Sequence, residues 1–191
     1  AVMTAVEKTG LPLIIHCESQ PMVSRLEAEA RARGENGLRA FCDSRPVEAE
    51  LESVTAVLAA AKATGCRVII AHVSAPETMD LILQAKKQGT NVYIESCAHY
   101  LCFDIDEMEQ HGPFARMKPP WRNREQKNRM AKLYADGLVD ITGSDHAPYT
   151  KQEKLKGGDD IWDAFDGLHG LEMTLPLLLK LVEDGVLTYE T

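Results

Sequence analysis

The chain has 191 residues, of which 45% are hydrophobic and 26% charged, as in an ordinary globular sequence of one domain or part of a larger one. Lys and Arg total 21 against 29 Asp and Glu, and the net charge of −8 disfavours nucleic acid and anionic membranes as partners. No apolar run approaches the ~20 residues that cross a bilayer, and no secretory leader opens the sequence, so a cytoplasmic location is expected. The five cysteines form no CxxC pair, and their odd number favours reduced thiols.

The first 65 residues alternate predicted helices with one short apolar strand. Two of these helices are followed by Gly10 and Gly65, in the way that a glycine ends many helices. The strand carries His16 at its carboxyl end. The predicted elements are helices over 1–8, 21–34 and 47–64 and a strand over 11–15.

Two further strands follow, and each again leads into polar residues. The first leads into His72 and the second into Glu95. The stretch 101–122 is less regular and contains two Pro-containing turns, so we expect a long loop across the mouth of a site. The predicted elements are strands over 67–71 and 91–94 and a helix over 76–88 between them.

The fourth predicted strand, 138–143, is β-branched and runs through a Gly-Ser turn into Asp145 and His146. A helix over 124–136 precedes it, and a polar stretch and an apolar helix over 168–184 follow. Strands that alternate with helices at these intervals predict a parallel sheet of the α/β class with right-handed crossovers.

Three strand ends therefore carry groups that can bind a metal: His16, His72 and Asp145. Taken alone, a His at the end of an apolar strand is more often a hydrogen-bonded core residue, and the Asp could simply cap the following turn. Together they suggest a site, because parallel neighbouring strands bring their carboxyl ends to one side of a sheet. Two imidazoles and a carboxylate suit Zn²⁺, and a metal-bound water supplies hydroxide near neutral pH. The sequence thus predicts metal-assisted hydrolysis.

Six motifs follow one another along the chain: IIHCES, SRPVEAE, GCRVIIAHVSAPE, ESCAHYL, KPPWR and GSDHAPYTKQEK. In this order they resemble the cyclic amidohydrolases of the amidohydrolase superfamily, the group of allantoinase, hydantoinase (dihydropyrimidinase) and dihydroorotase. The resemblance implies a TIM-like (β/α)8 barrel with a binuclear metal centre. It further implies that residues 1–191 are the C-terminal half of that barrel, roughly strands five to eight with their helices.

The resemblance also implies roles for the strand-end residues. His16 and His72 match the ligands of one metal on strands five and six, and Asp145 matches the strand-eight acid that touches the other metal and acts as general base. Glu95 and His99 lie in the strand-seven motif, where a buried structural role and a substrate contact both remain open. The family's His-x-His and carbamylated Lys have no counterpart in this chain, so we expect the chain alone to be inactive.

The loop motif departs from the family at Lys118, where hydantoinases and allantoinases tend to carry Ser and dihydroorotases Asn. This position contacts the substrate ring in the family. The cation could favour a substrate with a carboxylate, or it could extend to solvent. His146 is a further candidate for substrate binding and the rival of Asp145 as the base, but adjacent residues on an extended chain point opposite ways.

The resulting hypothesis is that the intact protein hydrolyses a cyclic amide, with metal-bound hydroxide attacking the ring carbonyl. The implied partners are a small cyclic amide substrate and further copies of the protein in a homo-oligomer. Motifs in the first half look most like allantoinase, whereas DHAPYTKQEK and GLHGLEMTLPLLL look most like dihydroorotase. The alternative is an inactive scaffold or assembly protein of the same superfamily, which would have lost its strand-end ligands.

Overall fold

A parallel sheet of four short strands forms the centre of the computed structural model, which describes residues 1–158 and 160–190. Neighbouring strands pair in chain order and in parallel, which confirms the predicted α/β arrangement. The third strand is longer than predicted, so Glu95 lies inside it and not beyond its end. The strands are β1 (Leu13–Ile15), β2 (Val68–Ile70), β3 (Val92–Cys97) and β4 (Ile141–Gly143).

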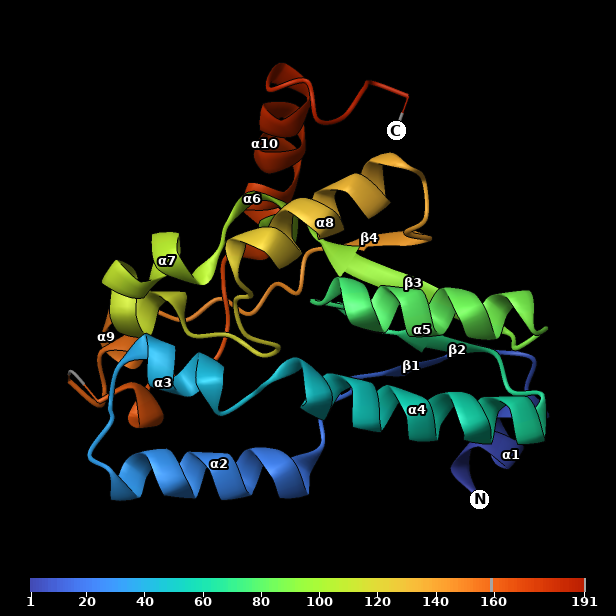
Figure 1. Ribbon diagram of the computed structural model, residues 1–191, viewed down its shortest axis with the longest axis horizontal. Coiled ribbons are helices and arrows are strands. Elements are labelled where there is room, and N and C mark those ends of the chain that lie inside the picture. The colour runs from blue at the N-terminus through green and yellow to red at the C-terminus, as the bar shows by residue number, and fades with distance from the viewer. Residues whose placement is uncertain (159, 191) are drawn as a thin grey trace.

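Three amphipathic helices cover one face of this sheet, α4 (Val47–Thr64), α5 (Pro76–Lys87) and α8 (Arg124–Ala135) (Figure 1). Each lies within one residue of its predicted bounds, because glycines that follow them adopt positive φ, for example Gly65 at 73°. The short α1 (Val2–Glu7) packs against α4. The structure therefore has the helix-covered sheet that the sequence predicts.

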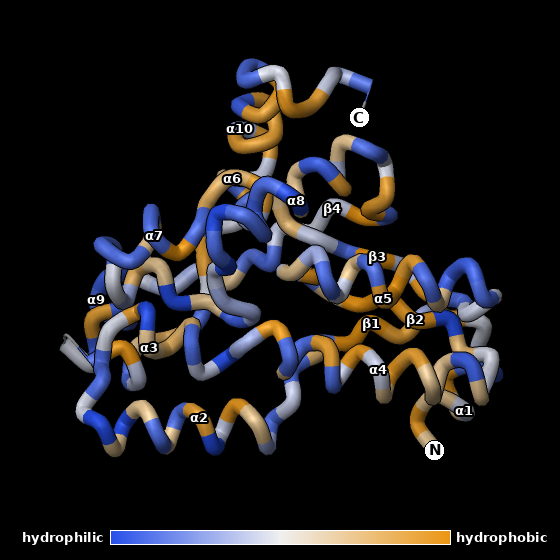
Figure 2. Tube along the Cα trace, viewed as in Figure 1, coloured by the Kyte–Doolittle hydropathy of each residue, from blue (hydrophilic) through white to orange (hydrophobic). Residues whose placement is uncertain are grey.

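The two faces of the sheet differ in burial. Val68, Ile70 and Ile94 are at most 1% exposed and pack with α4, α5 and α8 in the main core. Side chains alternate between faces along a strand, so Ile14 and Tyr93 point to the opposite face, where they are 63% and 38% exposed. Figure 2 shows the hydrophobic character of β1 and β2. Among the described residues, the second face of the sheet thus carries exposed apolar side chains.

A second core lies beside the carboxyl ends of the strands. It contains Phe41, Trp121 and Trp162 and is built by short helices. Part of it occupies the stretch expected to be an irregular loop, where Asp104 forms a capping box that starts a helix. The helices of this region are α2 (Gln20–Ala32), α3 (Leu38–Asp43), α6 (Ala98–Cys102), α7 (Ile105–Met108) and α9 (Lys151–Lys154), with 3₁₀ helices over Glu109–Ala115 and Ile161–Asp163.

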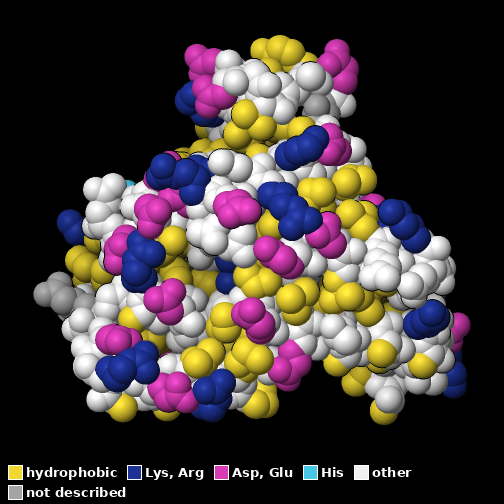
Figure 3. Space-filling model, in the orientation of Figure 1, with side chains coloured by type: hydrophobic (Ala, Val, Ile, Leu, Met, Phe, Trp, Pro, Cys, Tyr) yellow, Lys and Arg dark blue, Asp and Glu magenta, His cyan; other side chains and the backbone are white. Residues whose placement is uncertain are grey.

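The last helix, α10 (Gly170–Glu183), packs against α6 and projects from the rest of the molecule (Figure 1). Leu171 and Leu175 are 67% and 64% exposed, and Figure 3 shows hydrophobic side chains at its tip. Acidic and basic side chains are interspersed over the rest of the face in Figure 3. Among the described residues no helix is long and apolar enough to cross a membrane, and all five cysteines are unpaired.

Candidate metal centre

The imidazoles of His16 and His72 meet at the carboxyl ends of β1 and β2. His16 follows the last residue of β1, and His72 lies two residues beyond β2, the neighbouring strand. Nδ1 of His16 lies 3.1 Å from Nε2 of His72, and the rings are inclined at 68°. The structure therefore brings together the two histidines that the sequence selects, although 56 positions separate them.

This pair of nitrogen atoms fits a shared metal ion. Metal–nitrogen bonds of about 2.0–2.1 Å to two atoms 3.1 Å apart correspond to an angle of about 100° at the metal, close to tetrahedral. The other ring nitrogen of His72, Nδ1, is buried without a hydrogen-bond partner among the described residues. Within 1–158 and 160–190 no group of three or more His, Cys, Asp or Glu side chains is arranged to hold a metal.

His72 and Asp145 share an unusual backbone conformation. Their φ angles are 38° and 44°, and they are the only residues other than glycine with positive φ in the part of the chain that the structure describes. Such a conformation costs about 1–3 kcal/mol per residue and concentrates at functional sites. Both residues stand at strand ends, so the strain marks the same edge of the sheet as the histidine pair.

Charge and burial act in opposite directions on His72. Burial lowers the pKa of its imidazole, and the nearby carboxylate of Asp145 offsets part of this effect. The net shift is downward, so the imidazole is neutral near pH 7, as a metal ligand must be. The carboxylate of Asp145, two residues beyond β4, therefore favours the charged form of His72.

Glu95 supports His72 from within β3. Its Oε2 accepts a hydrogen bond from the backbone N–H of His72 at 3.3 Å, and its backbone carbonyl accepts from Val73 at 2.8 Å. A Cβ atom at Gly143 would overlap the Glu95 carboxylate, so the absence of a side chain there leaves room for Glu95. These contacts favour a structural role for Glu95 over contact with a substrate.

Two residues outside the predicted site are linked to it: Glu18 contacts His16, and Arg45 contacts Glu18. Glu18 Oε2 lies 3.0 Å from Nε2 of His16 and 2.9 Å from Nη1 of Arg45. Burial works to raise the pKa of Glu18, but the hydrogen bond from His16 and the charge of Arg45 bring it below its usual value. The only sequence signal was their place in the motifs HCES and SRPVEAE.

His99 is buried on α6, at 6% exposure, and its Nε2 has no hydrogen-bond partner among the described residues. Its ring lies 5.8 Å from that of Trp121, and burial lowers its pKa to about 3. It lines an apolar cavity of about 220 Å³ together with Phe103 and Leu177. The structural role for His99 is therefore supported by its packing, whereas contact with substrate stays a prediction.

The remaining two candidates point to other partners. Nδ1 of His146 accepts a hydrogen bond from the backbone of Leu171 at 3.2 Å, so this ring lies against the start of α10. Lys118 forms an ion pair of 2.7 Å with Asp166, so its charge is matched inside the chain and does not simply extend to solvent. Asp166 also pairs with Arg116 at 2.7 Å.

Comparisons with known proteins find relatives along most of the chain. No protein-family model matches the chain. It is 36% identical over 178 residues to an allantoinase of Solibacter usitatus and 34% identical over 178 residues to an L-hydantoinase of Paenarthrobacter aurescens. These matches cover 93% of this chain but only 38% and 39% of the two relatives.

Solved structures of hydantoinases superpose on almost the whole chain. The L-hydantoinase (dihydropyrimidinase) from Arthrobacter aurescens superposes with a TM-score of 0.95 and 34% identity, over 99% of this chain and 42% of that one. A D-hydantoinase from a Bacillus species, AR9, superposes with a TM-score of 0.92 and 26% identity, over 98% of this chain and 42% of that one.

Over nearly its whole length the chain is similar to allantoinases and hydantoinases, and it has the fold of part of the solved hydantoinases. It spans about two fifths of the length of the relatives that it matches.

Proposed function

We propose that the protein to which this chain belongs hydrolyses a cyclic amide with the help of a divalent metal ion, most simply Zn²⁺. The observation that carries this proposal is the 3.1 Å approach of His16 Nδ1 to His72 Nε2 at the ends of adjacent parallel strands. Relatives named allantoinase and L-hydantoinase support it. We further propose that residues 1–191 supply strands five to eight of the barrel, and that the other ligands of a binuclear centre come from outside this stretch.

In this proposal His16 and His72 bind the metal ion, and Asp145 transfers the proton. A bound divalent ion would lower the pKa of water to near neutrality and polarise the ring carbonyl. His16 and His72 would hold one such ion through Nδ1 and Nε2. Asp145 would take the proton of the attacking water and give it to the ring nitrogen as the amide bond breaks, since one group can serve both steps.

Lys118 bears on the choice of substrate. Asp166 lies 2.7 Å from Nζ of Lys118 and already balances the charge of this side chain, which weakens its attraction for a substrate carboxylate. We therefore infer a ring without a carboxylate at this position, such as a hydantoin or allantoin, in preference to dihydroorotate. Lys118 would then help to hold the loop at the mouth of the site through Asp166.

The test is turnover by the full-length protein with allantoin, hydantoin and dihydroorotate, before and after removal of metal by a chelator. We expect hydrolysis of at least one of the first two, loss of activity on chelation and recovery when Zn²⁺ is restored. If the protein is folded and metal-loaded but hydrolyses none of the three rings, the scaffold alternative is favoured instead.

A further inference from the structure

A buried carboxylate lies directly behind His16, on the side away from His72. Nε2 of His16 is 3.0 Å from Oε2 of Glu18, while Nδ1 of the same ring is 3.1 Å from Nε2 of His72. The side chain of Glu18 is only 5% exposed, whereas that of His16 is 44% exposed. The imidazole is thus held between a buried anion and the candidate metal position.

The carboxylate decides which ring nitrogen carries hydrogen. An ionised carboxylate can only accept hydrogen bonds, so a contact of 3.0 Å requires the hydrogen on Nε2 of His16. Nδ1 of the neutral ring is then unprotonated, and its lone pair is directed to the side of His72. This is the tautomer that a metal at the shared position needs.

Glu18 is itself fixed by Arg45. Nη1 of Arg45 donates to Glu18 Oε2 at 2.9 Å, and the two side chains are 7% and 5% exposed. Arg45 is held in turn, because its backbone carbonyl accepts a hydrogen bond of 2.7 Å from Arg122 and its guanidinium lies over the ring of Phe41. Glu18 therefore cannot follow a rotating imidazole and is a fixed acceptor for it.

We propose that Glu18, held by Arg45, is a positioning residue that fixes the tautomer and orientation of His16 for metal binding. The inference rests on the metal site of the proposed function but adds a requirement that the ligands alone do not impose. Partners of this kind affect metal affinity by about 10–100-fold when they are removed. The expected signature is a selective weakening of one metal, since Glu18 contacts a ligand of only one proposed ion.

The first measurement needs no metal. In full-length protein labelled with ¹⁵N-histidine and stripped of metal, long-range ¹H–¹⁵N correlation distinguishes the two neutral tautomers, and the His16 signal is assigned from a His16→Gln variant. We expect hydrogen on Nε2 of His16. Hydrogen on Nδ1 overturns the proposal, whether or not the protein binds metal.

The second measurement is a Zn²⁺ competition titration of the metal-free full-length protein against a chromophoric chelator. Glu18→Leu should weaken one of two bound equivalents by about 10–100-fold, and Glu18→Gln by less, because an amide oxygen is a weaker acceptor. The matched control is Glu29→Gln, which removes a carboxylate from an exposed ion pair with Arg25 and should leave both equivalents unchanged.

The outcomes separate this proposal from the proposed function. If the wild-type protein binds no Zn²⁺, the metal site and this inference both fail. If the wild type binds metal and neither Glu18 variant weakens it, only the role of Glu18 fails. Equal weakening of both equivalents also overturns it, because that would reflect a general structural defect. If Glu18→Leu does not fold, Glu18→Gln and the tautomer measurement decide.

Discussion

Two residues at strand ends, His72 and Asp145, hold backbone conformations that residues with side chains rarely adopt. The cost of this strain must be offset by the packing around them, which here includes the hydrogen bond from the His72 backbone to Glu95. The same two residues are candidates for metal binding and proton transfer. At the scale of single residues, strain and chemistry therefore coincide.

The proton-transfer role of Asp145 predicts a separation of activity from metal binding. In the full-length protein, Asp145→Asn should lower kcat by several orders of magnitude with metal content largely unchanged, because the amide keeps a ligating oxygen but is no base. The measurement is kcat together with metal content by mass spectrometry.

His146→Ala is the matched variant for this experiment, because the His146 ring contacts the start of α10. We expect it to retain most of the activity. A large loss of kcat in this variant, with Asp145→Asn near the wild type, would reverse the assignment of the base.

Burial of His99 predicts a loss of stability in acid. Its pKa is lowered to about 3, against about 6.5 in an unfolded chain, so between these values only the unfolded state binds the proton. Stability should therefore fall as pH falls from about 6.5 towards 3, by up to about 1.4 kcal/mol per pH unit from this group.

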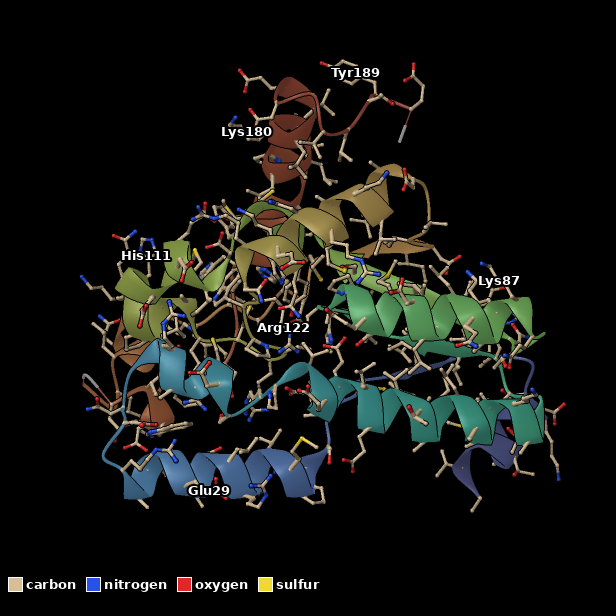
Figure 4. All side chains as sticks on the ribbon, viewed as in Figure 1. Glu29, Lys87, His111, Arg122, Lys180 and Tyr189 are labelled. Atoms are coloured by element: carbon tan, nitrogen blue, oxygen red, sulfur yellow. The ribbon has the colours of Figure 1, made fainter. Side chains whose placement is uncertain are left out.

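The check is denaturant unfolding of the full-length protein at a series of pH values. His99→Phe should flatten the acid slope, whereas His111→Gln, at an exposed residue of the 3₁₀ helix (Figure 4), should not. An unchanged slope in His99→Phe would mean that other groups cause the acid sensitivity.

At the scale of elements, a buried polar cluster ties the motifs SRPVEAE, HVSAPE and KPPWR together. Arg122 donates to Glu50 at 3.0 Å, to Ser74 Oγ at 3.0 Å and to the backbone of Arg45 at 2.7 Å. Figure 4 shows Arg122 at the centre of the molecule, where these segments meet. The cluster joins the start of α4 to the loop after β2, the loop that carries His72.

Breaking the buried ion pair of Arg122 with Glu50 should destabilise the fold strongly. Arg122→Met should lower the free energy of unfolding by about 3–5 kcal/mol, because it leaves Glu50, at 2% exposure, without its cation. Arg25→Met removes an arginine from an exposed i,i+4 pair and should cost less than about 1 kcal/mol. Urea unfolding of both variants tests this difference. Equal losses of unfolding free energy would contradict the claim that the buried pair stabilises the fold more than the exposed one.

The close approach of α10 to Ser144, the residue after β4, depends on a glycine. A Cβ atom at Gly170 would overlap the backbone carbonyl of Ser144, next to Asp145. Gly170→Ala should therefore displace the start of α10 and lower thermal stability by several degrees, which scanning calorimetry would detect. At Gly37 a Cβ meets no atom within 4 Å, so the control Gly37→Ala should have a much smaller effect, and similar losses would argue against this contact.

The sequence predicted the strands and the helices α4, α5 and α8 because each has a signal in its own residues. Apolar β-branched runs and glycines after helices gave all four strands and the bounds of α4, α5 and α8, and parallel pairing then brought His16 and His72 together. The contact of Glu18 with Arg45 and the pair of Lys118 with Asp166 join residues 27 and 48 positions apart. Such contacts depend on how loops pack and leave no periodic pattern, so they were not predicted.

At the scale of the whole molecule, one face of the sheet carries apolar side chains that the described part of the chain leaves exposed. Ile14, Tyr93 and Ile141 on this face are between 36% and 63% exposed, and the matched relatives are more than twice as long. Faces of this kind favour association or pairing with a complementary segment. The homo-oligomer of the intact protein stays a prediction.

The 191-residue chain alone should hydrolyse neither allantoin nor hydantoin, since we expect the other ligands of the proposed binuclear centre to lie outside it. Purified chain, supplemented with Zn²⁺ and assayed by product formation, checks this expectation, with the full-length protein as positive control. Turnover by the chain alone would show that its own residues complete a catalytic site.

The central claim is that His16 and His72 hold a catalytic metal ion together. The most direct test is the number of Zn²⁺ ions bound per full-length chain, measured with kcat for hydantoin or allantoin, in the wild type and in His16→Ala/His72→Ala. The account predicts that the double variant stays folded, binds one ion fewer than the wild type and loses turnover. A double variant with the metal content and kcat of the wild type would contradict it.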